Sequence, residues 1–87
     1  MNTSTAQVRS VCVFGLGYVG SVTAACLSQL GHKVTGVDRD EHKVRCLNQG
    51  QAPFVEPGLG EIIAQSVQAG RLRATSSAEE GLKDADV

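Results

Sequence analysis

A glycine cluster that directly follows a buried-strand pattern restricts the fold more than any other feature of this sequence. Val11 to Phe14 is a continuous, β-prone apolar run, typical of a strand buried on both faces. Glycines follow at positions 15, 17 and 20. Apolar residues then recur at helical spacing, at Val19, Val22, Thr23, Cys26, Leu27 and Leu30. Strand, glycine turn and helix in this order predict a parallel α/β unit.

The rest of the chain continues the alternation of strand and helix patterns. We expect strands at 33–37 and 71–75, helices at 41–48, 57–69 and 78–83, and the approach to a further strand at 84–87. Connections this short predict a Rossmann-type parallel sheet with flanking helices and right-handed crossovers. We expect residues 1–7 to be a flexible tail and residues 8–87 to be the first half only of such a domain, incomplete at the C-terminus.

The three glycines have distinct expected roles in binding a dinucleotide. Gly15 permits the tight strand-to-helix turn, Gly17 lets a pyrophosphate approach the backbone, and Gly20 lets the helix pack closely. The unpaired amides from Leu16 to Val19 are expected to face the phosphates at the helix N-terminus. Asp38, at the end of the second strand, can accept hydrogen bonds from both hydroxyls of an adenosine ribose.

The acid favours NAD over NADP, because Asp38 would repel a 2′-phosphate, although the neighbouring Arg39 could hold one. Taken singly, the glycines could be turn formers and Asp38 a helix N-cap. Lys43 on its own would be a solvated lysine of a surface helix, and Glu56 a cap of the third helix. Strand, glycines, helix and acid in one register favour the dinucleotide site.

Composition limits the other classes of function. Eight basic and nine acidic side chains give a formal net charge of −1, and only three residues are aromatic, so we expect no nucleic-acid or membrane partner. Cys12, Cys26 and Cys46 are an odd number without a CxxC pair, and we interpret them as reduced core thiols of a cytoplasmic protein. A lipoprotein signal ending at Cys26 is the weak alternative. No metal site is expected at His32 or His42.

The motifs together resemble the N-terminus of the UDP-glucose/GDP-mannose dehydrogenase family, from about Val11 to Val87. The resemblance is carried by Phe14-Gly15-Leu16-Gly17-Tyr18-Val19-Gly20, by Gly31 to Asp38, by Lys43, by Asn48-Gln49-Gly50 and by Val55-Glu56-Pro57-Gly58-Leu59. Members of that family oxidise the C6 alcohol of a nucleotide sugar to a carboxylate with two NAD, in polysaccharide biosynthesis. The resemblance implies that Tyr18, Val19, Asp38 and Lys43 belong to the NAD site.

The resemblance also bears on substrate and catalysis. Leu16, Ser21 and Val55 look more like the GDP-mannose branch than the UDP-glucose branch. The family's catalytic cysteine and its helpers lie beyond position 87, so no catalytic residue is assigned. The nucleotide sugar would bind through that missing portion, and the full-length protein would be a homo-oligomer.

We therefore expect the cofactor-binding portion of a nucleotide-sugar 6-dehydrogenase, inactive in isolation. The alternative is a stand-alone small module that binds NAD or a nucleotide without catalysis. A hydroxyacid or other NAD-dependent dehydrogenase that shares only the glycine fingerprint is a third possibility, and the Glu56-Pro57-Gly58-Leu59 segment argues against it.

Overall fold

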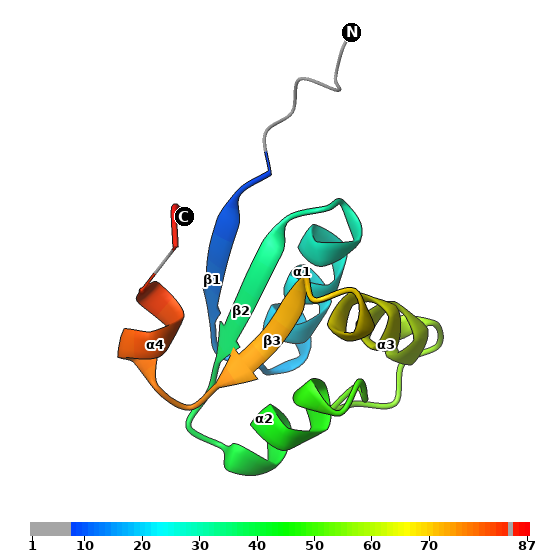
Figure 1. Ribbon diagram of the computed structural model, residues 1–87. Helices are drawn as coiled ribbons and strands as arrows, with labels where there is room; N and C mark the ends of the chain where they lie inside the picture. The colour runs from blue at the N-terminus through cyan, green and yellow to red at the C-terminus, as the bar shows by residue number, and fades with distance from the viewer. Residues whose placement is uncertain (1–7, 84) are drawn as a thin grey trace, which may run out of the picture.

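The computed structural model describes residues 8–83 and 85–87, and its centre is a three-stranded parallel sheet (Figure 1). The strands are β1 (Ser10–Phe14), β2 (Lys33–Val37) and β3 (Leu72–Thr75), in the order β1-β2-β3. This confirms the Rossmann-type α/β fold expected from the sequence. The tail predicted at residues 1–7 and Asp84 lie outside the described residues.

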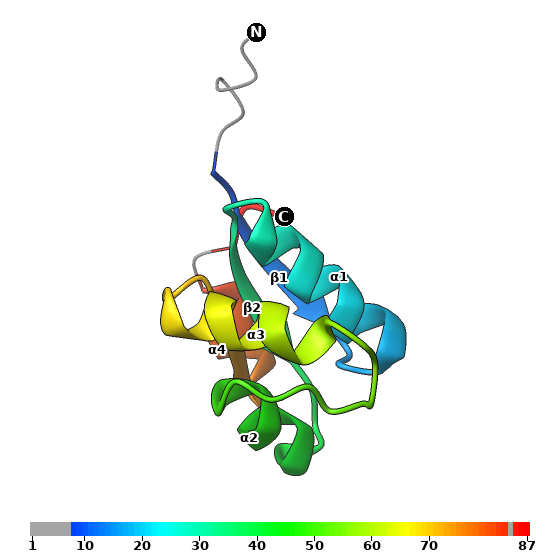
Figure 2. The ribbon, with the colours of Figure 1, turned by 90° about the vertical axis from the view of Figure 1, so that its right-hand side faces the viewer.

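Helices lie on both faces of the sheet and at one edge. Figure 2 shows α1 (Tyr18–Gln29) and α3 (Leu59–Gln68) together on one face, with α4 (Ala78–Leu82) behind the sheet. The remaining helix, α2 (Glu41–Asn48), packs beside β3. This arrangement leaves the carboxyl ends of β1 and β2 accessible at the turn that leads into α1.

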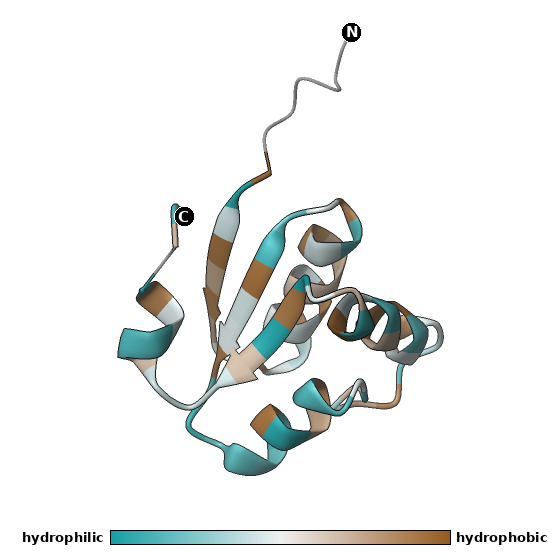
Figure 3. Ribbon diagram, in the orientation of Figure 1, coloured by the Kyte–Doolittle hydropathy of each residue, from teal (hydrophilic) through white to brown (hydrophobic). Residues whose placement is uncertain are grey.

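The core lies between the sheet and the layer of α1 and α3. Strand pairing places Val11, Val34 and Leu72 next to one another across the sheet. Figure 3 shows hydrophobic bands on all three strands. Val34 and Leu72 are almost fully buried, as is Ile63 of α3. Continuous burial across adjacent parallel strands is expected where a helix covers the sheet face.

The buried face of α1 is not the one predicted. The buried residues are small, namely Ser21, Ala24, Ala25 and Ser28, whereas most of the predicted apolar stripe is exposed. Leu30 is 76% exposed and Cys26 also faces outward, so the expectation of a core thiol at Cys26 is wrong. Small side chains allow α1 to approach both the sheet and α3, and the Ser28 hydroxyl donates to the Ala25 carbonyl while pairing with Ser66 of α3.

The helix termini follow local capping rules, with one correction. Asp40 caps α2 by accepting from the amides of His42 and Lys43, and the Ser77 hydroxyl accepts from the Glu80 amide at the start of α4. The third helix, however, begins at Leu59. Its N-cap is Gly58 at φ +83°, a left-handed conformation, so Pro57 precedes the helix and does not form its first turn.

The outer edge of β3 is closed by a side chain of α2. The Asn48 amide nitrogen donates to the Ala74 carbonyl over 2.9 Å, and the Ala74 amide donates to the Asn48 oxygen over 2.8 Å. The side chain thus replaces the backbone pairing of a neighbouring strand and leaves less of the edge free to pair.

The opposite edge, along β1, is approached by the C-terminal residues (Figure 1). The Gly15 amide and the Arg9 carbonyl form hydrogen bonds with β2, so the backbone groups of the alternate residues point away from β2. On that outer edge the Cys12 amide donates to the Val87 carbonyl over 3.0 Å. The strand is only half-buried, and Phe14 is 57% exposed. The prediction of full burial on both faces is therefore wrong: among residues 8–83 and 85–87, only the short α4 and residues 85–87 lie against β1 on the side away from α1 and β2.

Candidate cofactor-binding site

A hollow opens at the carboxyl ends of β1 and β2, where the glycine fingerprint and the acid meet. It has a volume of about 450 Å³ and is lined by Phe14, Gly15, Val37, Asp38, Arg39, Ser76 and Ala78. In open parallel sheets, ligands bind outside the carboxyl ends of the strands. The predicted site residues Gly15 and Asp38 thus lie on the wall of one hollow.

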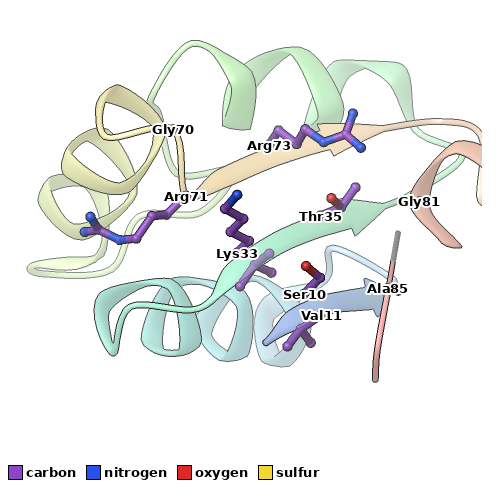
Figure 4. Close-up of a pocket in the computed structure, with 10 residues that line it drawn as sticks. Ser10, Val11, Lys33, Thr35, Gly70, Arg71, Arg73, Gly81 and Ala85 are labelled. Carbon is purple, nitrogen blue, oxygen red and sulfur yellow. The ribbon is translucent and has the colours of Figure 1, made fainter. Parts of the chain in front are cut away.

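A second hollow, of about 140 Å³, lies over the three strands next to Gly81 of α4 (Figure 4). Lys33 and Thr35 of β2 line it together with Arg73 of β3 and Ser10 of β1. None of the residues predicted to bind the cofactor lines it. The carboxyl-end hollow is therefore the candidate cofactor site.

The backbone of the fingerprint requires glycine at specific positions. Gly15 has φ +90°, in the left-handed region that residues with a Cβ rarely adopt. A Cβ added to Gly20 would collide with the backbone of Gly15, whereas one added to Gly17 would project into open space. The open space at Gly17 and the tight packing at Gly20 agree with a turn whose backbone a pyrophosphate can approach.

The acid is hydrogen-bonded to the fingerprint itself. The Leu16 amide donates to Oδ2 of Asp38 over 2.7 Å, and the Asp40 amide donates to Oδ1 over 2.8 Å. These two amides, first Asp40 and then Leu16, lower the pKa of Asp38, and the charge of Lys43 lowers it further. Each carboxylate oxygen keeps a second lone pair, so Asp38 can still accept from two ribose hydroxyls.

Leu16 differs from the expectation in one respect. Its amide is not unpaired, because it donates to Asp38. Its side chain is fully buried and packs over Gly36 of β2, where an added Cβ would lie 2.6 Å from Leu16 Cδ2. Leu16 therefore joins the fingerprint to β2, and the donors left for a phosphate belong to the residues after it.

The N-terminus of α1 has the properties of an anion site. Gly17 is its N-cap and has no side chain with which to cap the first amides, and the first turn contains no acidic residue. The first amides of a helix have no partner within it, and the helix dipole favours an anion there. Tyr18 and Val19 are 53% and 73% exposed, so their side chains are also accessible to a ligand.

Lys43 and Tyr18 both contact Phe54, in a cluster that sequence reasoning did not find. The Tyr18 hydroxyl donates to Oε1 of Glu56 over 3.2 Å, which raises the pKa of the Tyr18 phenol through the charge of Glu56 and then through this hydrogen bond. The rings of Tyr18 and Phe54 meet edge to face at 6.2 Å, and Lys43 Nζ lies 5.9 Å from the centre of the Phe54 ring. The expected capping role of Glu56 is wrong, because its carboxylate bonds to Tyr18 and Gly58 caps α3.

The model of the UDP-glucose/GDP-mannose dehydrogenase family, NAD binding domain, matches residues 9–87. The chain belongs to this family. NAD is therefore the cofactor of this dehydrogenase domain, as the fingerprint and Asp38 predicted.

Relatives of the dehydrogenase domain come from both branches of the family. GDP-mannose 6-dehydrogenase of Azotobacter vinelandii is 53% identical over 72 residues, which are 83% of this chain and 16% of the relative. UDP-glucose 6-dehydrogenase of Pseudomonas aeruginosa is 48% identical over 77 residues, which are 88% of this chain and 17% of the relative. The chain thus spans less than a fifth of these relatives.

Solved structures show the same fold. A crystal structure of a ternary complex of GDP-mannose dehydrogenase from Pseudomonas aeruginosa superposes with a TM-score of 0.85 at 47% identity, covering 91% of this chain and 18% of that one. A UDP-glucose dehydrogenase from Pyrobaculum islandicum gives a TM-score of 0.88 at 37% identity, covering 99% and 20%. The chain therefore has the fold of the matched segment of each enzyme.

His32 and His42 do not line the carboxyl-end hollow. Nδ1 of His32 accepts from the Arg9 amide, and Nε2 of His42 lies 3.7 Å from Cys46 Sγ. Within residues 8–83 and 85–87, no group of three or more His, Cys, Asp or Glu side chains is placed to hold a metal ion. In the same part of the chain, no helix is both long and apolar enough to cross a membrane.

Proposed function

We propose that this chain is the cofactor-binding part of an NAD-dependent nucleotide-sugar 6-dehydrogenase. The observation that carries the proposal is the hydrogen bond from the Leu16 amide to Asp38, because it joins the phosphate-binding turn to the ribose-binding acid in one rigid unit. The names of the relatives supply the reaction class. The C6 alcohol would lose two hydrides, one to each of two NAD, and water would supply the second oxygen of the carboxylate.

We propose that different residues bind different parts of NAD. Gly15, Gly17 and Gly20 shape the turn, and Leu16 fixes that turn to Asp38. The amides of Tyr18 and Val19, at the start of α1, would bind the pyrophosphate. Asp38 would accept hydrogen bonds from the adenosine ribose. Lys43, whose charge lowers the pKa of Asp38, would lie beside the same part of NAD.

GDP-mannose is the proposed substrate, ahead of UDP-glucose. Leu16, Ser21 and Val55, which look more like the GDP-mannose branch, support this choice. No catalytic residue is assigned among the 87 residues. The sugar and the catalytic groups would belong to the part of the family fold that this chain does not span.

The cellular setting is part of the same proposal. We place the protein in the cytoplasm, in polysaccharide biosynthesis, as a homo-oligomer when full length. Three free thiols, Cys12, Cys26 and Cys46, support a reducing compartment. A nucleotide-sugar substrate, rather than a nucleic acid or a membrane, suits a domain with a formal net charge of −1.

Turnover and binding assays test the proposal. The full natural chain is expected to reduce NAD with GDP-mannose, more slowly with UDP-glucose, and to bind NAD more tightly than NADP. The 87-residue chain alone is expected to produce no NADH. NADH production by that short chain would contradict the placement of the active site outside it, and failure of the full chain to bind NAD would overturn the function.

The stand-alone module makes different predictions for the same measurements. It requires a natural stop codon after Val87, cooperative melting of the 87-residue chain and cofactor affinity without turnover of any nucleotide sugar. Sequencing the codons after Val87 distinguishes the two functions directly.

A further inference from the structure

The segment between α2 and α3 contacts two long side chains of the proposed cofactor site, the exposed Tyr18 and the half-buried Lys43. Phe54 contacts Tyr18 edge to face with 6.2 Å between ring centres, and its ring centre lies 5.9 Å from Lys43 Nζ. Glu56, two residues further on, accepts from the Tyr18 hydroxyl over 3.2 Å. One short segment therefore touches residues that come from the fingerprint and from α2.

The segment is tied down at both ends. The Gln51 amide donates to the Cys46 carbonyl of α2 over 2.9 Å. The Leu59 amide donates to the Glu56 carbonyl over 3.1 Å, and the Leu59 side chain is buried in the core at the start of α3. Phe54 and Glu56 thus lie on a backbone segment that is anchored to α2 at one end and to α3 at the other.

Burial alone does not fix either side chain, because Tyr18 is exposed and Lys43 is only half-buried. Tyr18 is 53% exposed, and an exposed side chain is free to change rotamer within nanoseconds. Lysine carries its charge on a flexible four-carbon stem, and an aromatic face can orient that charge. The hydroxyl bond to Glu56 and the two ring contacts of Phe54 restrict both side chains.

We propose that Phe54 and Glu56 are positioning residues of the cofactor site, which hold Tyr18 and Lys43 in the orientation that contacts NAD. The inference rests on the proposed function. Neither residue needs to touch NAD, because Glu56 acts through the Tyr18 hydroxyl and Phe54 through the faces and edges of its ring.

The sign of one mutational effect separates this role from simple electrostatics. Glu56 is a negative charge near the proposed site of a pyrophosphate, so charge alone predicts that removing it strengthens NAD binding. A positioning role predicts the opposite for Glu56→Ala. Glu56→Gln removes the charge but keeps an oxygen that can accept from Tyr18, so it is expected to bind NAD within about twofold of the wild type.

The experiment measures NAD dissociation constants for variants of the full natural chain by titration calorimetry. Glu56→Ala is expected to raise the dissociation constant about fivefold, on the scale of losing one hydrogen bond. In a Tyr18→Phe background the same change is expected to add nothing, since the hydroxyl through which Glu56 acts is gone. Phe54→Leu, which keeps apolar bulk, is expected to weaken binding as well.

Glu61→Ala supplies the matched control, because Glu61 is an exposed carboxylate in the first turn of the adjacent α3. It is expected to leave the dissociation constant unchanged, and melting temperatures check that all variants fold. Tighter binding by Glu56→Ala, or an equal loss in the Tyr18→Phe background, would overturn the inference while leaving the proposed function intact. Absence of NAD binding by the wild type would instead refute the proposed function.

Discussion

The amide of Leu16 and the carboxylate of Asp38 are joined by a hydrogen bond of 2.7 Å, although the two residues are 22 positions apart. The bond links the turn after β1 to the end of β2. A hydrogen bond from a backbone amide to a charged acceptor is stronger than one between two neutral groups. The two motifs that mark a dinucleotide site in the sequence are therefore one structural unit.

Asp38→Ala is expected to weaken NAD binding by about 1–3 kcal/mol, because it removes the acceptor of the ribose hydroxyls and releases the Leu16 amide. Titration calorimetry on the full natural chain measures the change. Asp38→Asn removes the charge that opposes a 2′-phosphate next to Arg39, so its preference for NAD over NADP is expected to shrink. Unchanged NAD affinity in Asp38→Ala would remove Asp38 from the site.

The pH dependence of stability follows from the lowered pKa of Asp38. Because the folded-state pKa lies below the unfolded value of about 3.9, the carboxylate stabilises the fold above that value. The contribution is lost as the pH falls through the folded-state pKa. Urea unfolding at several pH values is expected to show a smaller acid loss for Asp38→Asn than for the wild type, with little difference in slope between pH 5 and 8.

Gly36→Ala tests the packing of Leu16 on β2. The new Cβ would lie 2.6 Å from Cδ2 of Leu16, which is fully buried and has little room to move. A loss of about 1–3 kcal/mol in the free energy of unfolding is expected. Gly60→Ala is the control, because its Cβ would enter open space on α3, and a gain of up to about 0.5 kcal/mol is expected there. Similar losses in both variants would contradict the packing argument.

Asn48→Ala tests the closed edge of the sheet. It removes two hydrogen bonds to Ala74 and leaves part-buried backbone groups of β3 unpaired, so a loss of about 1–3 kcal/mol is expected in denaturant unfolding. Gln49→Ala, at an exposed neighbouring side chain, is expected to change stability by less than about 0.5 kcal/mol. An equal effect of the two substitutions would show that the loss belongs to the helix end and not to the edge.

Thiol labelling tests the exposure of α1. Cys26 is exposed, whereas burial raises the pKa of the Cys12 thiol and lowers its thiolate fraction. A maleimide is expected to modify Cys26 well before Cys12, and peptide mass mapping identifies the order. Cys26→Ser is expected to abolish the fast phase. Faster labelling of Cys12 would contradict the placement of α1.

Local sequence signals predicted the elements and the fingerprint well, because each depends on nearby residues. Asp40 and Ser77 cap helices through amides two or three positions away, and Gly15 bends the chain at its own φ. The fold class followed from strands and helices in alternation, since short connections allow few other arrangements.

Contacts between distant segments were beyond those signals. The bond of Tyr18 to Glu56 spans 38 positions, and neither residue type indicates the other. The face of α1 was mistaken because helical periodicity ranks Leu30 above Ala24 as a core residue, whereas close helix packing selects the smaller side chain. Which residues become buried or form such contacts depends on which elements pack against each other. Local patterns in a single sequence do not indicate that packing.

The two edges of the sheet differ in what they offer to an incoming strand. The Asn48 side chain pairs with the outward backbone groups of Ala74 in β3. The outward backbone groups of β1 form hydrogen bonds with the backbone of residues 86 and 87. Residues 86 and 87, which follow β3 in the sequence, therefore lie against β1 and not beside β3. A strand added to the sheet would compete with a side chain at the β3 edge and with two backbone residues at the β1 edge.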